Sequence, residues 1–164
     1  MNVNLGCGGM NIPGYIRVDI NEKVKPDVLY DLNVYPYPFE NNQFDKILAS
    51  HIIEHLDNPE KFIKEIHRIA KSGCEITIIT PHYSNFTSYS DITHKWHFSS
   101  FSLNRERIGL DYKEKTTIKL RGFWQIFGLQ ILINKFNKAR IFWERYLSFV
   151  IRATDIKFVL TVNK

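Results

Sequence analysis

The sequence has little cysteine and no long apolar run, and each absence excludes a class of protein. Only two cysteines, Cys7 and Cys74, occur among 164 residues, too few for a disulfide scaffold or a four-cysteine zinc site. No apolar stretch approaches the roughly 18 residues of a membrane-spanning helix. Residues 1–5 already have the pattern of a strand and lack the basic segment, apolar stretch and cleavage site of a secretory signal, so we expect none. Because repeats, low-complexity segments and linkers are also missing, we expect a single domain over residues 1–164, soluble and cytoplasmic.

Aromatic and charged residues are plentiful, and the charge is unevenly divided. The 12 Phe, 8 Tyr and 3 Trp supply the apolar side chains that a disordered chain lacks. Residues 1–99 carry 9 Lys or Arg and 12 Asp or Glu, whereas residues 100–164 carry 13 and 5. The net charge of +5 is therefore the sum of −3 and +8. The second part has either a solvated basic surface or an anionic partner.

Strand and helix signals alternate along the first part of the chain. Strands are predicted over residues 3–5, 15–20, 27–30, 44–49 and 74–80. Before the last of these, Asn58 and Pro59 are typical of a helix start, and Gly73 is the predicted stop. This strand–helix–strand unit predicts parallel strands. The segments between the first four strands are too short for full crossover helices.

The second part of the chain is less regular. We expect a helix over residues 99–109, a strand over 116–120, a mainly helical stretch over 122–152 and a final strand over 155–162. Together with the first part, these elements predict an α/β fold.

A glycine loop follows the first predicted strand. Gly6 and Gly8 let the backbone turn sharply and approach a ligand, and Asp19 at the end of the next strand can accept ribose hydroxyls. A plain turn is the alternative. A dinucleotide fingerprint requires a third glycine, but Asn11 stands there, so a pyrophosphate is poorly served. A nucleoside without phosphates is favoured over the cofactor of a nucleotide-dependent oxidoreductase.

These segments resemble the class I S-adenosylmethionine-dependent methyltransferases, and especially a small subgroup whose first crossover helix is reduced to a loop. The resemblance rests on residues 3–8, 14–19, 31–32, 44–56 and 91–101, with a weaker match over 154–163. It implies a Rossmann-like open sheet, mainly parallel with an antiparallel last strand, helices on both faces and some shortened crossover helices. It also implies S-adenosylmethionine as the cofactor.

The resemblance divides the chain into a cofactor-binding half, residues 1–99, and a basic, aromatic acceptor-side half, residues 100–164. The implied cofactor residues are Gly6, Cys7 and Gly8 at the methionine end, Asp19 at the ribose, Asp31 and Leu32 near the adenine, and Ser50 and His51 in the pocket wall.

Histidines offer further chemistry. His51, Glu54 and His55 have the spacing of inverted zinc peptidases, but residues 57–59 interrupt any helix there, and we predict no metal site. His94 and His97 are the acid–base candidates, because neutral imidazole can take a proton near neutral pH. The alternative for both is packing in a loop.

Residues 136–152 combine a wide apolar face with a polar stripe. Packing on the sheet is favoured, and contact with a membrane or an apolar acceptor is the alternative. We predict a methyltransferase acting on an unidentified acceptor, by analogy a small molecule or a sugar-containing intermediate. The rival is an inactive methyltransferase-fold module that binds RNA or another anionic partner, although no nucleic-acid motif is present.

Overall fold

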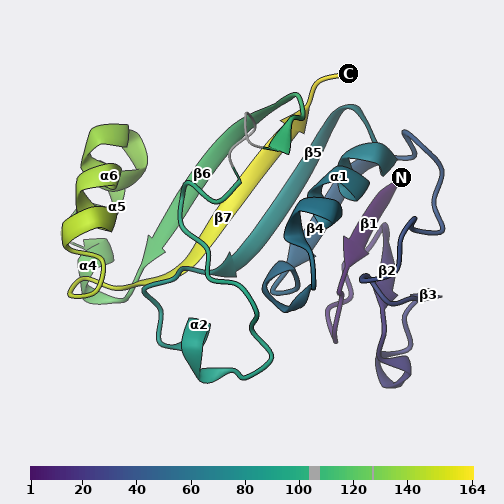
Figure 1. Ribbon diagram of the computed structural model, residues 1–164, viewed down its shortest axis with the longest axis horizontal. Helices are drawn as coiled ribbons and strands as arrows, with labels where there is room; N and C mark the ends of the chain where they lie inside the picture. Colours follow the sequence, from purple (N-terminus) through teal and green to yellow (C-terminus); the bar gives the residue numbers. More distant parts are fainter. Residues whose placement is uncertain (104–107, 127) are drawn as a thin grey trace.

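The computed structural model describes residues 1–103, 108–126 and 128–164, and a seven-stranded sheet runs through its middle (Figure 1). The strands are β1 (Asn2–Leu5), β2 (Tyr15–Asp19), β3 (Val28–Leu29), β4 (Phe44–Ser50), β5 (Ala70–Pro81), β6 (Tyr112–Leu120) and β7 (Ala153–Val162). Their order is β3-β2-β1-β4-β5-β7-β6. The first five strands in this order are parallel, and β7 is antiparallel to both neighbours. The predicted Rossmann-like α/β fold is confirmed.

The connections between the first four strands are as short as predicted. Turns over residues 6–14 join β1 to β2, and the 3-10 helix η1 (Glu22–Val24) is a single turn between β2 and β3. Residues 30–43 join β3 to β4 without a helix. The loops that follow β1 and β2 therefore stay close to the ends of their strands.

The crossover helix α1 (Pro59–Ile69) joins β4 to β5 and lies over one face of the sheet (Figure 1). It begins as predicted, because the Asn58 side chain accepts a hydrogen bond of 2.9 Å from the Lys61 N–H. Its apolar side, with Phe62 and Ile66, is buried against the strands.

The end of α1 differs from the prediction. The helix stops at Ile69, and β5 begins at Ala70, which pairs with Phe44. Gly73 lies inside β5 with a φ of 79°, where the pairing register between β4 and β5 shifts. The predicted helix stop at Gly73 is therefore wrong, and its left-handed backbone serves a strand irregularity instead.

The second part of the chain adds the last two strands of the sheet, β7 and then β6, beside β5. β6 and β7 pair from Tyr112↔Val162 to Leu120↔Ala153 and are longer than predicted. Because β7 is antiparallel to β5 and β6, β6 ends at the edge where the parallel strands also end. Residues 121–152 therefore leave and rejoin the sheet at this edge.

Three short helices follow β6, as predicted for residues 122–152: α4 (Phe123–Ile126), α5 (Leu129–Lys135) and α6 (Asn137–Tyr146) (Figure 1). α6 buries Trp143, but Phe142 and Tyr146 are 56% and 63% exposed. The favoured packing of this apolar stretch on the sheet is therefore right for one side of α6 and wrong for the other. The helix predicted over 99–109 is not formed in residues 99–103, of which 100–103 make turns; residues 104–107 lie outside the described residues, and Ile108 is helical.

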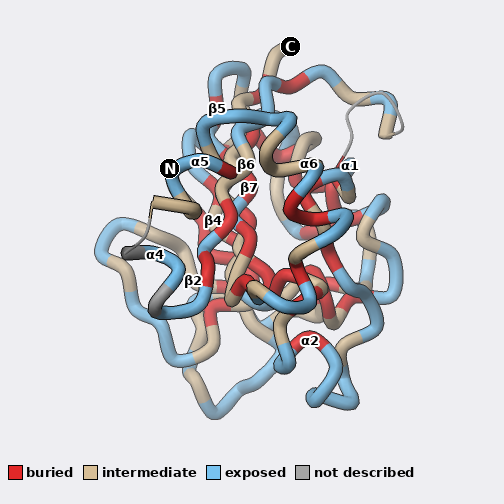
Figure 2. Tube along the Cα trace, turned by 90° about the vertical axis from the view of Figure 1, so that its left-hand side faces the viewer, coloured by how far each residue is buried: buried red, intermediate tan, exposed pale blue. Residues whose placement is uncertain are grey.

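Buried residues gather along the central strands, and the exposed stretches are mostly loops and helix surfaces (Figure 2). The loop over residues 82–103 includes the short helix α2 (Thr87–Ser90). Among the described helices, none combines the length and the apolar character required to cross a bilayer.

Candidate active site

The glycine loop after β1 is folded onto the end of β2. The N–H groups of Gly6 and Cys7 both donate to the Val18 carbonyl, at 2.9 and 3.0 Å. Gly6 has a φ of 70°, and a Cβ there would lie 2.7 Å from Ile52 Cγ1. Both the backbone angle and the close approach therefore require glycine.

Asp19 is fixed beside this loop. Its Oδ2 accepts a hydrogen bond of 2.7 Å from the Gly8 N–H, and its Oδ1 accepts one of 2.8 Å from the Asn21 N–H. A carboxylate has about four lone-pair sites, so two of them remain for a ligand after these bonds form. The fold thus presents an oriented acceptor of hydroxyl hydrogen bonds at the carboxyl end of β2.

A cavity of about 150 Å³ opens next to this carboxylate. Four of the predicted cofactor residues line it: Gly6, Asp19, Asp31 and Leu32. The remaining four, Cys7, Gly8, Ser50 and His51, are outside its lining. Sequence reasoning named His55 only in the zinc-peptidase pattern and gave no cofactor role to the other lining residues: Ile20, Tyr30, Asn33, Ile52, His55 and Leu56. Most of them adjoin a predicted residue in the chain, which is the signal that could have found them.

Cys7 and Asp31 have local structural roles. Cys7 is buried, and burial followed by the nearby Asp19 charge raises the pKa of its thiol. The thiol is therefore protonated at neutral pH and is a poor nucleophile. Asp31 accepts a hydrogen bond of 2.9 Å from the Asn33 N–H, which shapes the turn beside the cavity.

The turn after β4 carries His51 in a left-handed conformation, with a φ of 53°. Its Nδ1 lies 3.4 Å from Glu54 Oε1, and its Nε2 lies 3.9 Å from Asp155 Oδ1. The Glu54 carboxylate, with help from Asp155, raises the pKa of His51 above its usual value despite partial burial.

Glu54 is the most deeply buried acid of this region, with 1% of its surface exposed. Thr80 donates a hydrogen bond of 3.0 Å to its Oε2. Its Oε1 accepts no hydrogen bond that meets the usual geometry from the described residues, but it faces the His51 ring, with Nδ1 at 3.4 Å. A buried carboxylate oxygen without a hydrogen bond is costly unless a charge or a ligand faces it.

His55 and His94 complete a cluster around Glu54. Their rings meet edge to face at 4.6 Å, and ligand atoms of all three side chains lie within 4.8 Å of one another. The spacing could hold a metal ion or form an acid–base group. The zinc-peptidase pattern would instead pair His51 with His55 on one helix. Residues 53–55 form only a single 3-10 turn, η2 (Ile53–His55), so that helix is not formed.

The two predicted catalytic histidines are in different surroundings. The His94 side chain is 7% exposed and its Nδ1 lies 3.3 Å from the Ser88 carbonyl, within the Glu54 cluster. His97 is exposed, stacks on Tyr89 at 4.1 Å and contacts the Ser88 hydroxyl. It lines a different hollow, on the side of α1.

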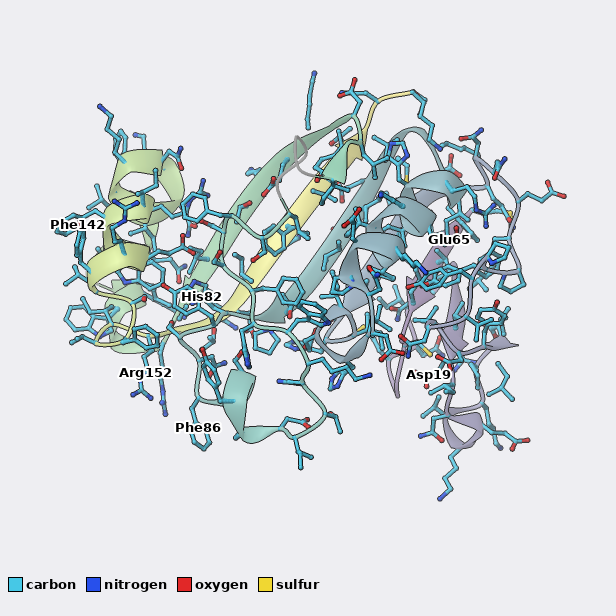
Figure 3. All side chains as sticks on the ribbon, in the orientation of Figure 1. Asp19, Glu65, His82, Phe86, Phe142 and Arg152 are labelled. Atoms are coloured by element: carbon cyan, nitrogen blue, oxygen red, sulfur yellow. The ribbon has the colours of Figure 1, made fainter. Side chains whose placement is uncertain are left out.

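A larger hollow of about 460 Å³ lies between α6 and the loop over residues 82–103. Tyr83, Phe101 and Arg145 are in its lining, together with Glu144. Glu144 is buried and contacts His82 Nε2 at 3.0 Å. Ser100 donates two further hydrogen bonds to this carboxylate. These hydrogen bonds connect α6 to the loop that also carries His94. Figure 3 labels His82 in this loop and Asp19 at the end of β2.

The sequence of this chain matches a family model and two curated proteins. Residues 4–78 match a family model described as a methyltransferase domain. Ajmaline N-methyltransferase from Rauvolfia serpentina is 37% identical over 86 residues, which cover 47% of this chain and 28% of the relative. Norajmaline N-methyltransferase from the same plant is 37% identical over 68 residues, 42% of this chain and 22% of the relative. The match thus spans about a quarter of the length of these relatives.

Solved structures match the whole chain at low identity. A SAM-dependent methyltransferase from Archaeoglobus fulgidus has a TM-score of 0.65 and 21% identity, and the match covers 98% of this chain and 85% of that one. Phosphoethanolamine N-methyltransferase 2 from Haemonchus contortus, in complex with S-adenosyl-L-methionine, has a TM-score of 0.68 and 15% identity, covering 99% and 48%. These likenesses show the fold.

Proposed function

We propose that this chain transfers a methyl group from S-adenosylmethionine to a small-molecule acceptor, because its residues 4–78 match a methyltransferase-domain model and its fold is similar to that of SAM-dependent methyltransferases. The observation that carries the proposal is Asp19, which the Gly8 N–H holds at the mouth of a cavity lined by Gly6 and Leu32. When bound, the cofactor supplies an electrophilic methyl group on a sulfonium.

The residues present fit this cofactor. Asp19 retains lone pairs for two ribose hydroxyls, and Leu32 and Tyr30 offer apolar surface for a flat base. Glu54 and Asp155, together with the acidic balance of residues 1–99, favour a cationic donor. Gly6 brings backbone rather than side chain to the opening.

His94 is the side chain that we propose takes a proton from the acceptor. It belongs to the Glu54 cluster, and His55 of the same cluster lines the cavity, whereas His97 lines another hollow. Its Nδ1 faces the Ser88 carbonyl, which orients the ring, and Nε2, which lies 3.8 Å from Asp91 Oδ2, is the nitrogen that we propose as the base. Positioning of the acceptor supplies the rest of the acceleration.

A nitrogen acceptor is supported by the two plant N-methyltransferases that match the first half. The buried Glu54 carboxylate also favours an amine, because it attracts the positive charge that a nitrogen gains as it is methylated. The larger hollow, with Tyr83, Phe101 and Arg145, is the proposed acceptor side, and a sugar-containing intermediate also fits its polar and aromatic lining.

Calorimetry with S-adenosylmethionine and its demethylated product tests the cofactor assignment. Asp19→Ala should weaken binding by about 1–3 kcal/mol, the scale for losing a charged hydrogen-bond acceptor. Asp45→Ala is the matched control, because Asp45 is an exposed acid at the opposite end of β4. No binding at millimolar ligand, or equal losses in the two variants, would overturn the assignment.

Methyl transfer from isotope-labelled S-adenosylmethionine to a panel of small amines, alcohols and sugars tests the acceptor class. We expect label in an amine and not in RNA. The rival binding module predicts cofactor binding without turnover for any acceptor, together with RNA association that weakens steeply with salt.

A further inference from the structure

One face of α6 is exposed although it is rich in apolar side chains. Phe142, Tyr146 and Phe149 are 56%, 63% and 64% exposed. With Lys138 and Arg145, which are also exposed, they recur at the spacing of a single helix face that continues into the turn after α6. Figure 3 shows Phe142 on the outer side of the helix. This face, defined by residues 138, 142, 145, 146 and 149, is called the outer face of α6 below.

The surface around the outer face is strongly basic. Residues 121–152 contain six Lys or Arg and one acid, Glu144. That acid is buried and hydrogen-bonded to Ser100, so it does not offset the surface charge. The exposed residues Arg121 and Arg152 line one hollow with Val150, which is 80% exposed. Arg152 Nε donates a hydrogen bond of 3.3 Å to the Phe149 carbonyl, so this hollow adjoins the outer face and apolar side chains and cations are interleaved there.

From this arrangement we propose that the outer face of α6 docks on the surface of an anionic lipid bilayer. Aromatic and aliphatic side chains can enter the headgroup region, while Lys and Arg contact lipid phosphates at its level. The aliphatic Val150 distinguishes this partner from nucleic acid, because bases stack on aromatic rings and gain little from a valine. The inference goes beyond methyl transfer and does not depend on it.

The position of the outer face in the fold gives the docking a consequence. Residues 121–152 begin and end at the edge where the parallel strands end, since Leu120 pairs with Ala153 there. Asp19 and the glycine loop stand at the same edge, farther along the sheet (Figure 3). The outer face of α6, however, lies at the β6 end of the molecule and Asp19 toward its β3 end (Figure 3), so a bilayer bound to α6 would leave the candidate active site uncovered.

Vesicle flotation of the full chain tests the proposal. We expect it to float with vesicles made of equal parts phosphatidylglycerol and phosphatidylcholine, and not with phosphatidylcholine alone. Arg145→Gln should lower the partition coefficient about fivefold, the effect of one basic residue near an anionic surface. Phe142→Ser should lower it about tenfold through the loss of apolar burial.

Two control variants match these changes elsewhere on the surface. Leu29→Ser removes a side chain that is 57% exposed on β3, at the opposite edge of the sheet. Lys61→Gln removes a cation from the exposed side of α1. Neither should change flotation, and all four variants should unfold at the temperature of the unmodified chain, because the altered side chains are exposed.

Three outcomes would overturn the proposal: no flotation with anionic vesicles at low salt, equal flotation of the outer-face and control variants, or binding of a single-stranded RNA oligonucleotide in place of vesicles. A dimer in light scattering that Phe142→Ser dissociates, without vesicle binding, would also overturn it and assign the face to a second copy of the chain.

Discussion

The two parts of the chain meet at one edge of the sheet, but they use it differently. In residues 1–99, hydrogen bonds between short loops position side chains such as Asp19 and Glu54 beside a small cavity. In the described part of residues 100–164, helices place aromatic and basic side chains at the surface. The first part thus has the features of a small ligand site, and the second combines a larger hollow with an exposed apolar and basic surface. Similarity to known families follows the same division, since the matched family model ends at residue 78.

The largest expected effect is on stability and comes from a change in the glycine loop after β1, which holds Asp19 in place. Gly6→Ala should lower the free energy of unfolding by about 3 kcal/mol, because alanine is strained at this positive φ and its Cβ would overlap Ile52. Gly9→Ala is the control in the same loop, since its Cβ meets no atom within 4 Å. Urea denaturation measures both, and equal stabilities would show that the close approach is unimportant.

The next prediction concerns how the second part is fastened. Glu144→Gln should cost about 2 kcal/mol, because it weakens the bonds to His82 and Ser100. Glu75→Gln, at an exposed position of β5, should cost nothing measurable. If both variants unfold alike in urea, Glu144 does not hold α6 to the loop.

Glu144 also predicts a pH dependence of stability. Burial alone would raise the pKa of Glu144, but the bonds from His82 and Ser100 outweigh it and leave the pKa below the ordinary 4.5. A depressed folded-state pKa stabilises the protein above about 4.5, and this contribution is lost as the pH falls through the folded value. The unmodified chain should therefore lose more stability on acidification than Glu144→Gln. A parallel loss in both would contradict this origin.

A smaller effect is expected in the pH dependence of affinity, which should differ between S-adenosylmethionine and its demethylated product. The pKa of His51 is raised by Glu54, so the imidazole stays positive to a pH above its ordinary 6.5. Once it is neutral, Glu54 and Asp155 attract a cation more strongly. S-adenosylmethionine should therefore bind about fivefold more tightly above this pKa, whereas its uncharged-sulfur product should change little. Calorimetry across pH with His51→Asn as the control measures the difference; identical pH profiles for the two ligands would place the sulfonium elsewhere.

The smallest expected effect is that of a chelator. Glu54, His55 and His94 are close enough for a metal ion, but the proposed reaction uses them without one. Dialysis against a chelator should leave turnover unchanged. If the chelator abolishes activity and added zinc restores it, the cluster is a metal site and not an acid–base group.

How far the sequence predicts this molecule also differs between its parts. The positions of the first five strands and the start of the crossover helix at Asn58 and Pro59 follow from short apolar runs and a capping pattern, because these signals are local. The end of that helix was missed, since Gly73 serves pairing between β4 and β5, which is a tertiary requirement. His94 was predicted as an acid–base residue, but its partnership with Glu54 depends on a fold of the loop over residues 82–103 that no local signal encodes.

The exposed side of α6 is a second feature that the sequence did not predict. An apolar face is normally read as a buried one, because burial of such side chains drives folding. Trp143 is buried beside His82 and donates to the Ile151 carbonyl, whereas Phe142 and Tyr146 stay exposed. Which of several apolar sides faces the core is decided by the neighbouring elements and not by the helix itself.

A crystal structure of the chain with the demethylated product of S-adenosylmethionine tests the central claim most directly. The account predicts the ribose hydroxyls within hydrogen-bond distance of the Asp19 carboxylate and the adenine against Leu32. A ribose bound away from Asp19, or the product seated in the hollow beside Arg145, would contradict it.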